Sequence, residues 1–247
     1  MKGKNMISVV IPVHNALPYL KRCLTSLEEN TSSEYELIII DDVSDKETKE
    51  FLASYVLSFK GKIQLITNIE HKWVNYNWNT GVSMVDGTHI AVINSDIELP
   101  KYWDKELMNT LISSMIACPY EVEGNIAFTI KPFMPPHMIK GPCFMFKAKD
   151  VDKLFPIPEQ IRHWCGDNVI ADRCLKCKGN VAFNPSVIIT HGVTKSSEFS
   201  KGQEVERKEY WGRVLKDIDE YIKIAHKNSL PYIKPIRANI QSIVNKL

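Results

Sequence analysis

Apolar residues in the first hundred positions of the chain follow two periodicities in turn. Three runs are continuous and apolar, as in strands that a parallel sheet buries on both faces: residues 7–12, 37–40 and 90–93. A further strand is expected at residues 62–67. Segments between the strands have the spacing of amphipathic helices: residues 20–27, 46–57 and 75–84. Strands that alternate with helices of this length predict right-handed βαβ units and an α/β fold.

The pattern changes beyond residue 100. Residues 101–117 are expected to form a helix, because Leu107, Leu111 and Met115 would share one face. The following thirty or so residues are irregular and rich in Pro, with short strand-like pieces at 126–129 and 143–146. The remaining expected elements are a helix that ends near residue 176, strands at 181–183 and 187–190, and a charged helix at 204–227.

Polar residues follow two of the predicted strands at the point where each strand ends. Asp41 and Asp42 follow one apolar run, and Asn94, Ser95 and Asp96 follow another. The carboxyl ends of parallel strands share one edge of the sheet, which is where open α/β sheets bind ligands. A carboxylate at this edge can hold a hard divalent cation, and the cation can hold a diphosphate. The pattern therefore favours a nucleotide site with a metal, although an Asp after a strand can also be a helix cap.

Composition and charge limit the function classes without choosing one. The net charge of +2 gives no global field that demands nucleic acid or a membrane as partner, and no apolar run approaches the ~18 residues of a membrane span. The N-terminal residues lead directly into a strand and lack the features of a signal peptide. We therefore expect a cytoplasmic protein with reduced thiols, in which Cys174 and Cys177 pack in the core; a zinc site is the alternative.

With these residues in view, the chain resembles the family 2 glycosyltransferases of the GT-A fold. The resemblance covers residues 7–196 and rests on a series of short segments in the family's order: residues 8–15, 41–45, 79–81, 94–96, 141–146, 164–168 and 191–196. It implies a Rossmann-like, mostly parallel sheet flanked by helices. On this basis residues 1–100 are expected to bind a nucleotide sugar, residues 101–200 to form the acceptor-binding half of the same domain, and residues 201–247 to form a helical tail.

The resemblance also implies roles for individual residues. Asp96 is expected to bind Mn²⁺ or Mg²⁺, with His191 either as a further ligand, which would favour Mn²⁺, or as a packed histidine. Asp167 is the expected catalytic base. Asp41 is expected to accept a hydrogen bond from the nucleobase. The full set of expected donor-binding residues is Pro12, Val13, His14, Asn15, Asp41, Asp42, Asn79, Asn94 and Ser95. The expected acceptor-binding residues are Trp164, with a core role as its alternative, and Gly141.

Two positions depart from the family pattern. Asn94 stands where an Asp is common, which leaves Asp96 as the metal carboxylate. Gly166 and Asn168 flank a single acid, Asp167, where the family carries a pair. Neither departure excludes activity, because a metal with few protein ligands is normal when substrate phosphates complete its coordination shell.

The expected function is metal-dependent, inverting transfer of a sugar, with a UDP-sugar as the expected donor. The acceptor would be a hydroxyl on a glycan, a lipid-linked glycan or another polymer. One alternative is a phage-type enzyme that glycosylates hydroxymethylated bases in DNA. A nucleotidyltransferase is a second alternative, but it would need a Gly-rich loop after the first strand, which residues 12–16 do not form. An inactive binding module is a third, but it would have no need of Asp96 and Asp167 together.

The C-terminal residues 221–247 contain Lys and Arg but no Asp or Glu. Pro231 and Pro235 predict a break before a last helix. One face of that helix would carry an aliphatic stripe: Ile233, Ile236, Ile240, Ile243 and Leu247. A basic amphipathic helix of this kind can pack on its own domain, pair with a second subunit or lie on an anionic surface. Packing on its own domain is the expected arrangement.

Overall fold

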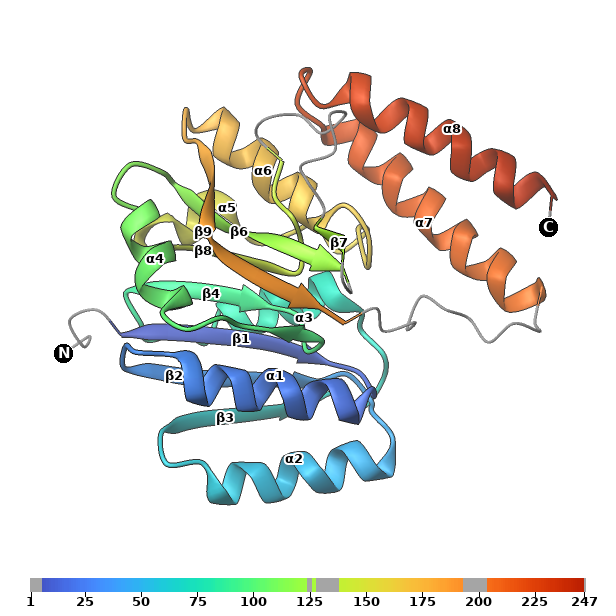
Figure 1. Ribbon diagram of the computed structural model, residues 1–247. Coiled ribbons are helices and arrows are strands. Elements are labelled where there is room, and N and C mark those ends of the chain that lie inside the picture. The colour runs from blue at the N-terminus through green and yellow to red at the C-terminus, as the bar shows by residue number, and fades with distance from the viewer. Residues whose placement is uncertain (1–5, 124–125, 128–137, 193–203, 247) are drawn as a thin grey trace.

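The computed structural model describes residues 6–123, 126–127, 138–192 and 204–246. The N-terminal half is a parallel sheet with connecting helices, as the apolar runs predicted (Figure 1). Its strands are β1 (Ile7–Val13), β2 (Tyr35–Asp41), β3 (Lys62–Thr67) and β4 (His89–Ile93). Its helices are α1 (Leu17–Asn30), α2 (Lys46–Ser58) and α3 (Val74–Val82). The strands lie in the order β3-β2-β1-β4, so the predicted βαβ arrangement is confirmed.

The strands of this half end at a common edge. Val13 of β1 pairs with Asp41 of β2, and Asp41 pairs in turn with Thr67 of β3. Val92 of β4 pairs with Val10 of β1, so the residues after Ile93 leave the sheet on the same side. The two acidic segments seen in the sequence therefore follow neighbouring ends of one sheet.

Side chains of β1 alternate between two apolar clusters, one on each face of the sheet. Val9 packs with Leu20 of α1 in one cluster, whereas Val10 packs with Trp78 of α3 in the other. α3 lies so close to the sheet that a Cβ on Gly81 would stand 2.3 Å from Cγ1 of Val10. This close approach explains why position 81 is a Gly, because a larger residue would fit there only if the sheet shifted.

The second half extends the sheet with antiparallel and mixed pairing. Its elements are β5 (Ile97–Glu98), α4 (Trp103–Thr110), β6 (Ile116–Glu123), β7 (Ile126–Ala127), β8 (Cys143–Lys147), the 3₁₀ helix η1 (Ala148–Asp150), α5 (Val151–Leu154), α6 (Gly166–Lys176) and β9 (Val181–His191). β8 runs antiparallel to β4, and the order continues β8-β6-β9-β5, with β7 paired to β6. The expected mostly parallel sheet thus has an antiparallel strand at its centre.

The prediction of a helix over residues 101–117 is wrong for its last part. α4 ends at Thr110, and Ile116 and Ala117 begin β6 instead. Ile116 pairs with Phe146 of β8 on one side and Val181 of β9 on the other. Both neighbouring strands therefore fix this segment as an inner strand, and that long-range pairing overrides a local spacing that fits a helix.

β9 is a single strand where two were expected. The pairing of β6 with β9 shifts between Pro119, which lies opposite Asn184, and Tyr120, which lies opposite Ile188. The extra residues on β9 include Pro185, which has no N–H to donate to the ladder. A bulge is where a sheet tolerates such a residue. The gap between the two predicted strands, at residues 184–186, is therefore an irregularity within one strand.

The tail consists of α7 (Glu204–Ile224) and α8 (Leu230–Lys246), which pack against each other beside α6 (Figure 1). Ile218, Tyr221, Ile233 and Ile240 belong to the same core cluster as Phe144 of β8. None of the described helices is both long and apolar enough to cross a bilayer.

The predicted stripe on the last helix is correct only in part. Ile233 and Ile240 are buried against the domain, but Ile236 and Ile243 remain 42% and 37% exposed, and Leu247 lies outside the described residues. Pro235 lies inside α8 and does not break it. Of the described residues of the predicted stripe, only Ile233 and Ile240 therefore pack on the chain's own domain.

Candidate active site

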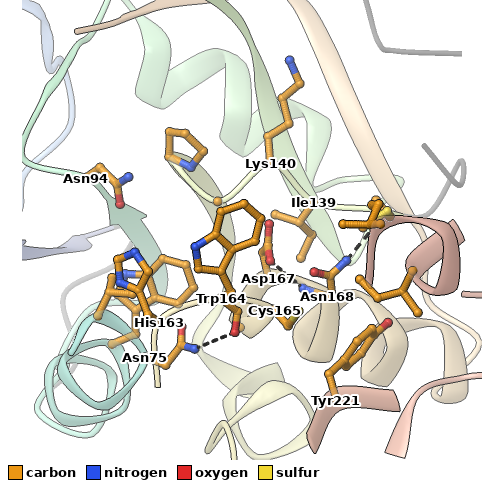
Figure 2. Close-up of a pocket in the computed structure, with 18 of the residues that line it drawn as sticks. Asn75, Asn94, Ile139, Lys140, His163, Trp164, Cys165, Asp167, Asn168 and Tyr221 are labelled. Atoms are coloured by element: carbon orange, nitrogen blue, oxygen red, sulfur yellow. Dashed lines mark hydrogen bonds between the residues drawn. The ribbon is translucent and has the colours of Figure 1, made fainter. Parts of the chain in front are cut away.

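The larger of two adjoining cavities contains the predicted base. It has a volume of about 710 Å³, and its walls come from the start of α6, the segment before β8 and the two tail helices. Asp167, Trp164 and Gly141 all line it, and Figure 2 labels Asp167 and Trp164 among the side chains around it. The fold therefore brings together the predicted base and both predicted acceptor-binding residues.

The surroundings of Asp167 favour its neutral form. Burial raises the pKa of its carboxyl to about 6, against the opposing effect of backbone N–H groups. One of these, the N–H of Asn168, donates to Oδ1 of Asp167 at 2.9 Å. A Cβ on Gly141 would stand 3.5 Å from Oδ2, so the backbone of residue 141 closely approaches the carboxyl. The result is an acid that exchanges its proton near neutral pH.

The backbone before Asp167 explains why position 166 is a Gly. Cys165 adopts a left-handed conformation with φ of 63° at the start of α6. A Cβ on Gly166 would stand 2.0 Å from Oδ1 of Asn75, so that position admits only Gly. Asn75 in turn donates from Nδ2 to the carbonyl of Ile161. The tight turn places Asp167 in the first turn of the helix, where backbone N–H groups are free to bind it.

A buried acid on α7 holds the loop that leads into Asp167. Asp217 is 3% exposed and accepts hydrogen bonds from the backbone N–H groups of Arg162, His163 and Trp164 at 2.8–3.1 Å. Sequence reasoning missed this residue. The available signal was an Asp among the inward-facing apolar positions of a helix, next to Ile218.

The smaller cavity, of about 370 Å³, lies over the strand ends. Seven of the predicted donor and metal residues line it: Pro12, Val13, His14, Asp42, Asn94, Ser95 and Asp96. It shares Asn94, His163 and Tyr210 with the larger cavity, so the two form one continuous depression. Sequence reasoning missed the opposite wall, which includes His71, Trp73 and Arg213.

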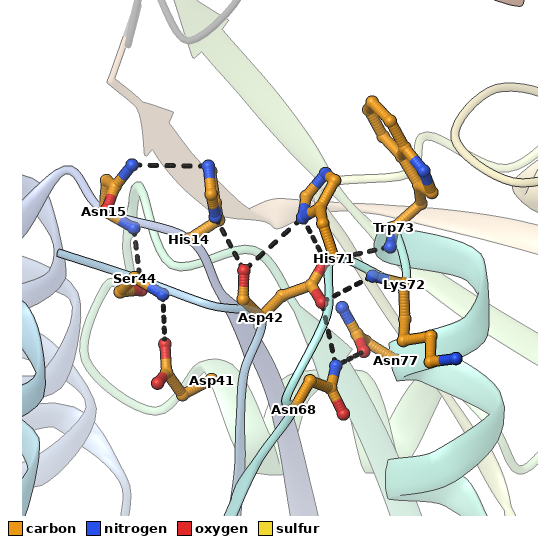
Figure 3. Close-up of polar contacts among 10 residues, drawn as sticks. All are labelled: His14, Asn15, Asp41, Asp42, Ser44, Asn68, His71, Lys72, Trp73 and Asn77. Atoms are coloured by element: carbon orange, nitrogen blue, oxygen red, sulfur yellow. Dashed lines mark hydrogen bonds and ion pairs between the residues drawn. The ribbon is translucent and has the colours of Figure 1, made fainter.

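Asp42, and not Asp41, is the carboxylate that faces this cavity. Asp41 is 1% exposed, does not line the cavity, and accepts through Oδ1 from the N–H of Ser44 at 3.0 Å, so its role at the nucleobase stays a prediction. Asp42 accepts from four donors, which are Asn68 Nδ2, His71 Nδ1 and the backbone N–H groups of Lys72 and Trp73 (Figure 3). Burial alone would raise the pKa of Asp42, but these hydrogen bonds, led by that of His71, hold it well below its usual range.

Two other predicted donor residues have structural partners. Asn15 accepts from the N–H of Asp45 through Oδ1 and joins the loops after β1 and β2. Asn79 exchanges two hydrogen bonds of 2.8 Å with the main chain of Ile157, and it lines neither of the two cavities. Asp45 caps α2 by accepting from the N–H of Thr48. Asn79 therefore fastens a loop and does not contact the space over the strand ends.

Strained backbone concentrates around the smaller cavity. Ala16, Val43 and Trp73 have positive φ values of 59°, 62° and 73°, which are unfavourable for residues with a Cβ. Trp73 is held in this conformation by its hydrogen bond to Asp42. Its ring lies 4.3 Å from the guanidinium carbon of Arg213, which comes from α7. The tail thus supplies part of the wall.

Asp96 and His191 meet between the two cavities. Nε2 of His191 lies 3.3 Å from Oδ1 of Asp96, and its Nδ1 lies 2.5 Å from Oε1 of Glu121. Burial would lower the pKa of His191, but the hydrogen bonds to Asp96 and Glu121 raise it to about 10. Glu121 was missed in the sequence, where it lies in the stretch without clear periodicity.

The separation of Asp96 and His191 suits a shared cation. Two ligands of one octahedral ion, each about 2.1 Å from it, stand about 3 Å apart. Across the described residues no set of three or more His, Cys, Asp or Glu side chains is arranged to hold a metal. A cation at Asp96 and His191 would therefore need most of its ligands from elsewhere, such as substrate phosphates and water.

Solved structures of glycosyltransferases share this fold. GalNAc-T7, solved with UDP, GalNAc and Mn²⁺, superposes with a TM-score of 0.66 at 16% identity, over 87% of this chain and 52% of that one. Residues 1–349 of TarS from S. aureus, solved with UDP, superpose with a TM-score of 0.63 at 12% identity, over 98% of this chain and 92% of that one. The GT-A fold expected from the sequence is confirmed.

The family is shown by sequence as well. The model of glycosyl transferase family 2 matches residues 8–154, and the chain belongs to that family. Glycosyltransferase AglE of Haloferax volcanii is 25% identical over 125 residues, which are 50% of this chain and 40% of that protein. The chain thus spans less than half the length of this curated relative.

Proposed function

We propose that the chain transfers a sugar from a nucleoside diphosphate sugar to an acceptor hydroxyl, with inversion at the sugar carbon. The hydroxyl oxygen bonds to that carbon, the bond from the carbon to the diphosphate breaks, and the hydroxyl proton passes to Asp167. The observation that carries the proposal is the carboxyl of Asp167, with its pKa near 6, in a cavity continuous with the one over the strand ends. A base with such a pKa is unprotonated at neutral pH yet still accepts a proton.

The smaller cavity is the proposed donor site. Pro12, Val13 and His14 form the wall from β1, and the carboxylate of Asp42 holds the opposite wall through the N–H groups of Lys72 and Trp73. Trp73 presents an aromatic face, and the guanidinium of Arg213 stacked on it brings a positive charge toward the phosphates. UDP is the first nucleotide to test, because the GalNAc-T7 and TarS structures contain it.

Asp96 and His191 are the proposed metal ligands, and Asn94 can add an amide oxygen. A bound Mn²⁺ or Mg²⁺ would act as a Lewis acid that neutralises the leaving diphosphate. The nitrogen of His191 favours Mn²⁺ over Mg²⁺, and GalNAc-T7 was solved with Mn²⁺. The position of this pair between the two cavities supports the assignment, because the diphosphate must lie beside the reacting carbon.

The larger cavity is the proposed acceptor site. Trp164 and Gly141 line it next to Asp167, and Tyr221, Tyr232 and other residues of the tail close its far side. Aromatic rings of this kind commonly stack on sugar rings or other flat apolar groups through their faces. Residues 1–100 would then supply most of the donor site, with Arg213 and Tyr210 added from α7, and the later residues would supply most of the acceptor site.

The proposal is tested by thermal unfolding of the protein with a panel of nucleotide sugars, with and without Mn²⁺. A ligand that binds the folded state at 100 times its Kd stabilises it by about 2.7 kcal/mol. We expect one nucleotide class to raise the Tm, and Mn²⁺ to enlarge the shift in the wild type but not in Asp96→Ala. No shift with any nucleotide sugar would contradict the proposed donor site.

A further inference from the structure

Glu121 is a buried acid beside the proposed metal ligands. It lies on β6, is 8% exposed, and places Oε1 2.5 Å from Nδ1 of His191. Its second oxygen, Oε2, lies 3.6 Å from Nζ of Lys140. Both oxygens of the carboxylate are therefore directed at named partners, and neither is left to bind a cation directly.

Strand pairing fixes the position of His191 relative to both acids. On one side His191 pairs with Ile97 of β5, the residue that follows Asp96. The N–H of Gly192 also donates to the carbonyl of Asp96 at 2.7 Å. On the other side β9 pairs with β6, where Ile189 lies opposite Glu121. The backbone thus brings the imidazole between Asp96 and Glu121, and only the rotation of the ring remains to be set.

We propose that Glu121 is a positioning residue that orients His191 as a metal ligand, an inference that rests on the proposed metal-dependent function. With Nδ1–H donated to Glu121, the proton of the neutral imidazole is on Nδ1. Nε2 hydrogen-bonds to Oδ1 of Asp96 at 3.3 Å. A cation bound between these two atoms would take the place of the proton on Nε2, and the lone pair of Nε2 would then be the ligand. A carboxylate behind a ligating histidine fixes the tautomer, holds the ring and makes the nitrogen a better donor.

The same carboxylate connects the metal side of the site to the base. Lys140, which approaches Oε2 of Glu121, immediately precedes Gly141, whose backbone lies against Asp167. Glu121 therefore holds two things at once: the ring of a metal ligand and the segment that packs on the base. This second contact sets a requirement for the test, which must separate an effect on the metal from an effect on the fold.

The test measures Mn²⁺ affinity by electron paramagnetic resonance with UDP at saturation, so that no acceptor or turnover is needed. Glu121→Ala is expected to weaken Mn²⁺ binding by about 10–100-fold. Glu121→Gln should weaken it less, because its amide oxygen can still accept from Nδ1–H, and it is the variant to use if Glu121→Ala does not fold. Glu98→Gln is the matched control, since Glu98 also lies on a strand paired with β9 but forms its ion pair with Arg22. The control should bind Mn²⁺ as the wild type does.

A double-mutant cycle shows whether Glu121 acts through His191. If it does, Glu121→Ala in a His191→Ala background causes no further loss of Mn²⁺ affinity, and the nitrogen coupling to bound Mn²⁺ weakens in Glu121→Ala. Additive losses, or wild-type affinity in Glu121→Ala while Asp96→Ala and His191→Ala lose binding, would overturn the inference and leave the proposed function intact. Absence of Mn²⁺ binding in the wild type would overturn both the metal assignment and this inference.

Discussion

At the scale of single residues, the site depends on what surrounds each carboxylate. Asp42 is buried and Asp167 is partly buried, yet their pKa values move in opposite directions. Asp42 receives four hydrogen bonds, which outweigh its burial, whereas at Asp167 burial outweighs the backbone N–H groups that approach it. The first carboxylate is therefore a permanent anion, and the second can gain and lose a proton near neutral pH.

Asp167 should make the folded protein less stable at neutral pH. Its pKa is about 6 in the folded state, against an ordinary value of 3.8 for Asp, so between these values the folded chain binds more protons than the unfolded chain. Stability therefore falls as the pH rises through this window. We expect Asp167→Asn to raise the free energy of unfolding on the order of 1–2 kcal/mol at pH above about 7, and to change it little near pH 4. Urea unfolding at the two pH values measures this, and equal effects at both would contradict the raised pKa.

The sequence identified the acidic pair after β2 and predicted Asp41 as the nucleobase acceptor, whereas Asp42 is the member that lines the smaller cavity. The left-handed backbone at Val43 follows Asp42, and the loop beyond β3 binds the carboxylate of Asp42. Neither feature has a sequence signal, because Val is unusual at positive φ and the loop contact spans thirty residues. The motif therefore predicted the place of the site but not which carboxylate faces it.

Asp42→Ala should weaken UDP binding more than Asp41→Asn does. Removal of Asp42 releases the backbone N–H groups of Lys72 and Trp73, and with them the wall of the proposed donor site, a loss of about 1–3 kcal/mol in binding. Asp41→Asn is the control, since its amide oxygen can still accept from Ser44. Titration calorimetry with UDP gives both affinities. If Asp41→Asn loses more UDP affinity than Asp42→Ala, the expected order is contradicted and Asp41 is the residue that matters for the nucleotide.

At the scale of elements, α7 holds the loop that precedes Asp167. Three consecutive N–H groups of residues 162–164 converge on Asp217, which lies more than fifty residues later in the chain. The helical spacing of the sequence predicted α7 itself. It could not predict this contact, because an Asp within an apolar stripe does not reveal its partner. The error at the end of α4 has a similar cause, since strand pairing of β6 was invisible in the local pattern.

Asp217→Ala should lower both stability and turnover. It leaves three N–H groups without their acceptor, which we expect to cost about 2–3 kcal/mol in the free energy of unfolding. It should also lower kcat, because the loop before Asp167 loses its anchor. Asp219→Ala is the matched control on the same helix, as its exposed ion pair with Arg237 is worth about 0–1 kcal/mol. Chemical unfolding and donor turnover are measured on both variants, and equal effects would show that Asp217 has no special role.

At the scale of the whole molecule, the C-terminal helices complete both cavities. Arg213 and Tyr210 of α7 line the smaller cavity, and Tyr232 and Ile236 of α8 line the larger one. The sequence predicted the fold, the shared sheet edge and the positions of Asp96 and Asp167. It predicted that the tail packs on the domain, but not that the tail forms walls of the site, because those contacts join residues from opposite ends of the chain.

The buried line of α8 should carry most of its stability. Ile240 is 5% exposed and Ile243 is 37% exposed on the same helix. Ile240→Ala is expected to lower the free energy of unfolding by about 2–4 kcal/mol, because it leaves a cavity in the core. Ile243→Ala should cost less than about 1 kcal/mol. Equal losses in a denaturant titration would mean that both side chains are covered, and that the exposed face of α8 has an occupant.

The central claim, that Asp167 is the base beside a bound nucleotide sugar, is tested most directly by the pH dependence of UDP-sugar hydrolysis with Mn²⁺. Water serves as the acceptor, so the natural acceptor is not needed. The wild-type rate should rise with pH through about 6 as Asp167 loses its proton, and then level off. Asp167→Asn should be slower by about 10²–10⁴ and lack this rise. A wild-type rate that is flat from about pH 5 to about pH 8, or an Asp167→Asn rate equal to it, would contradict the account.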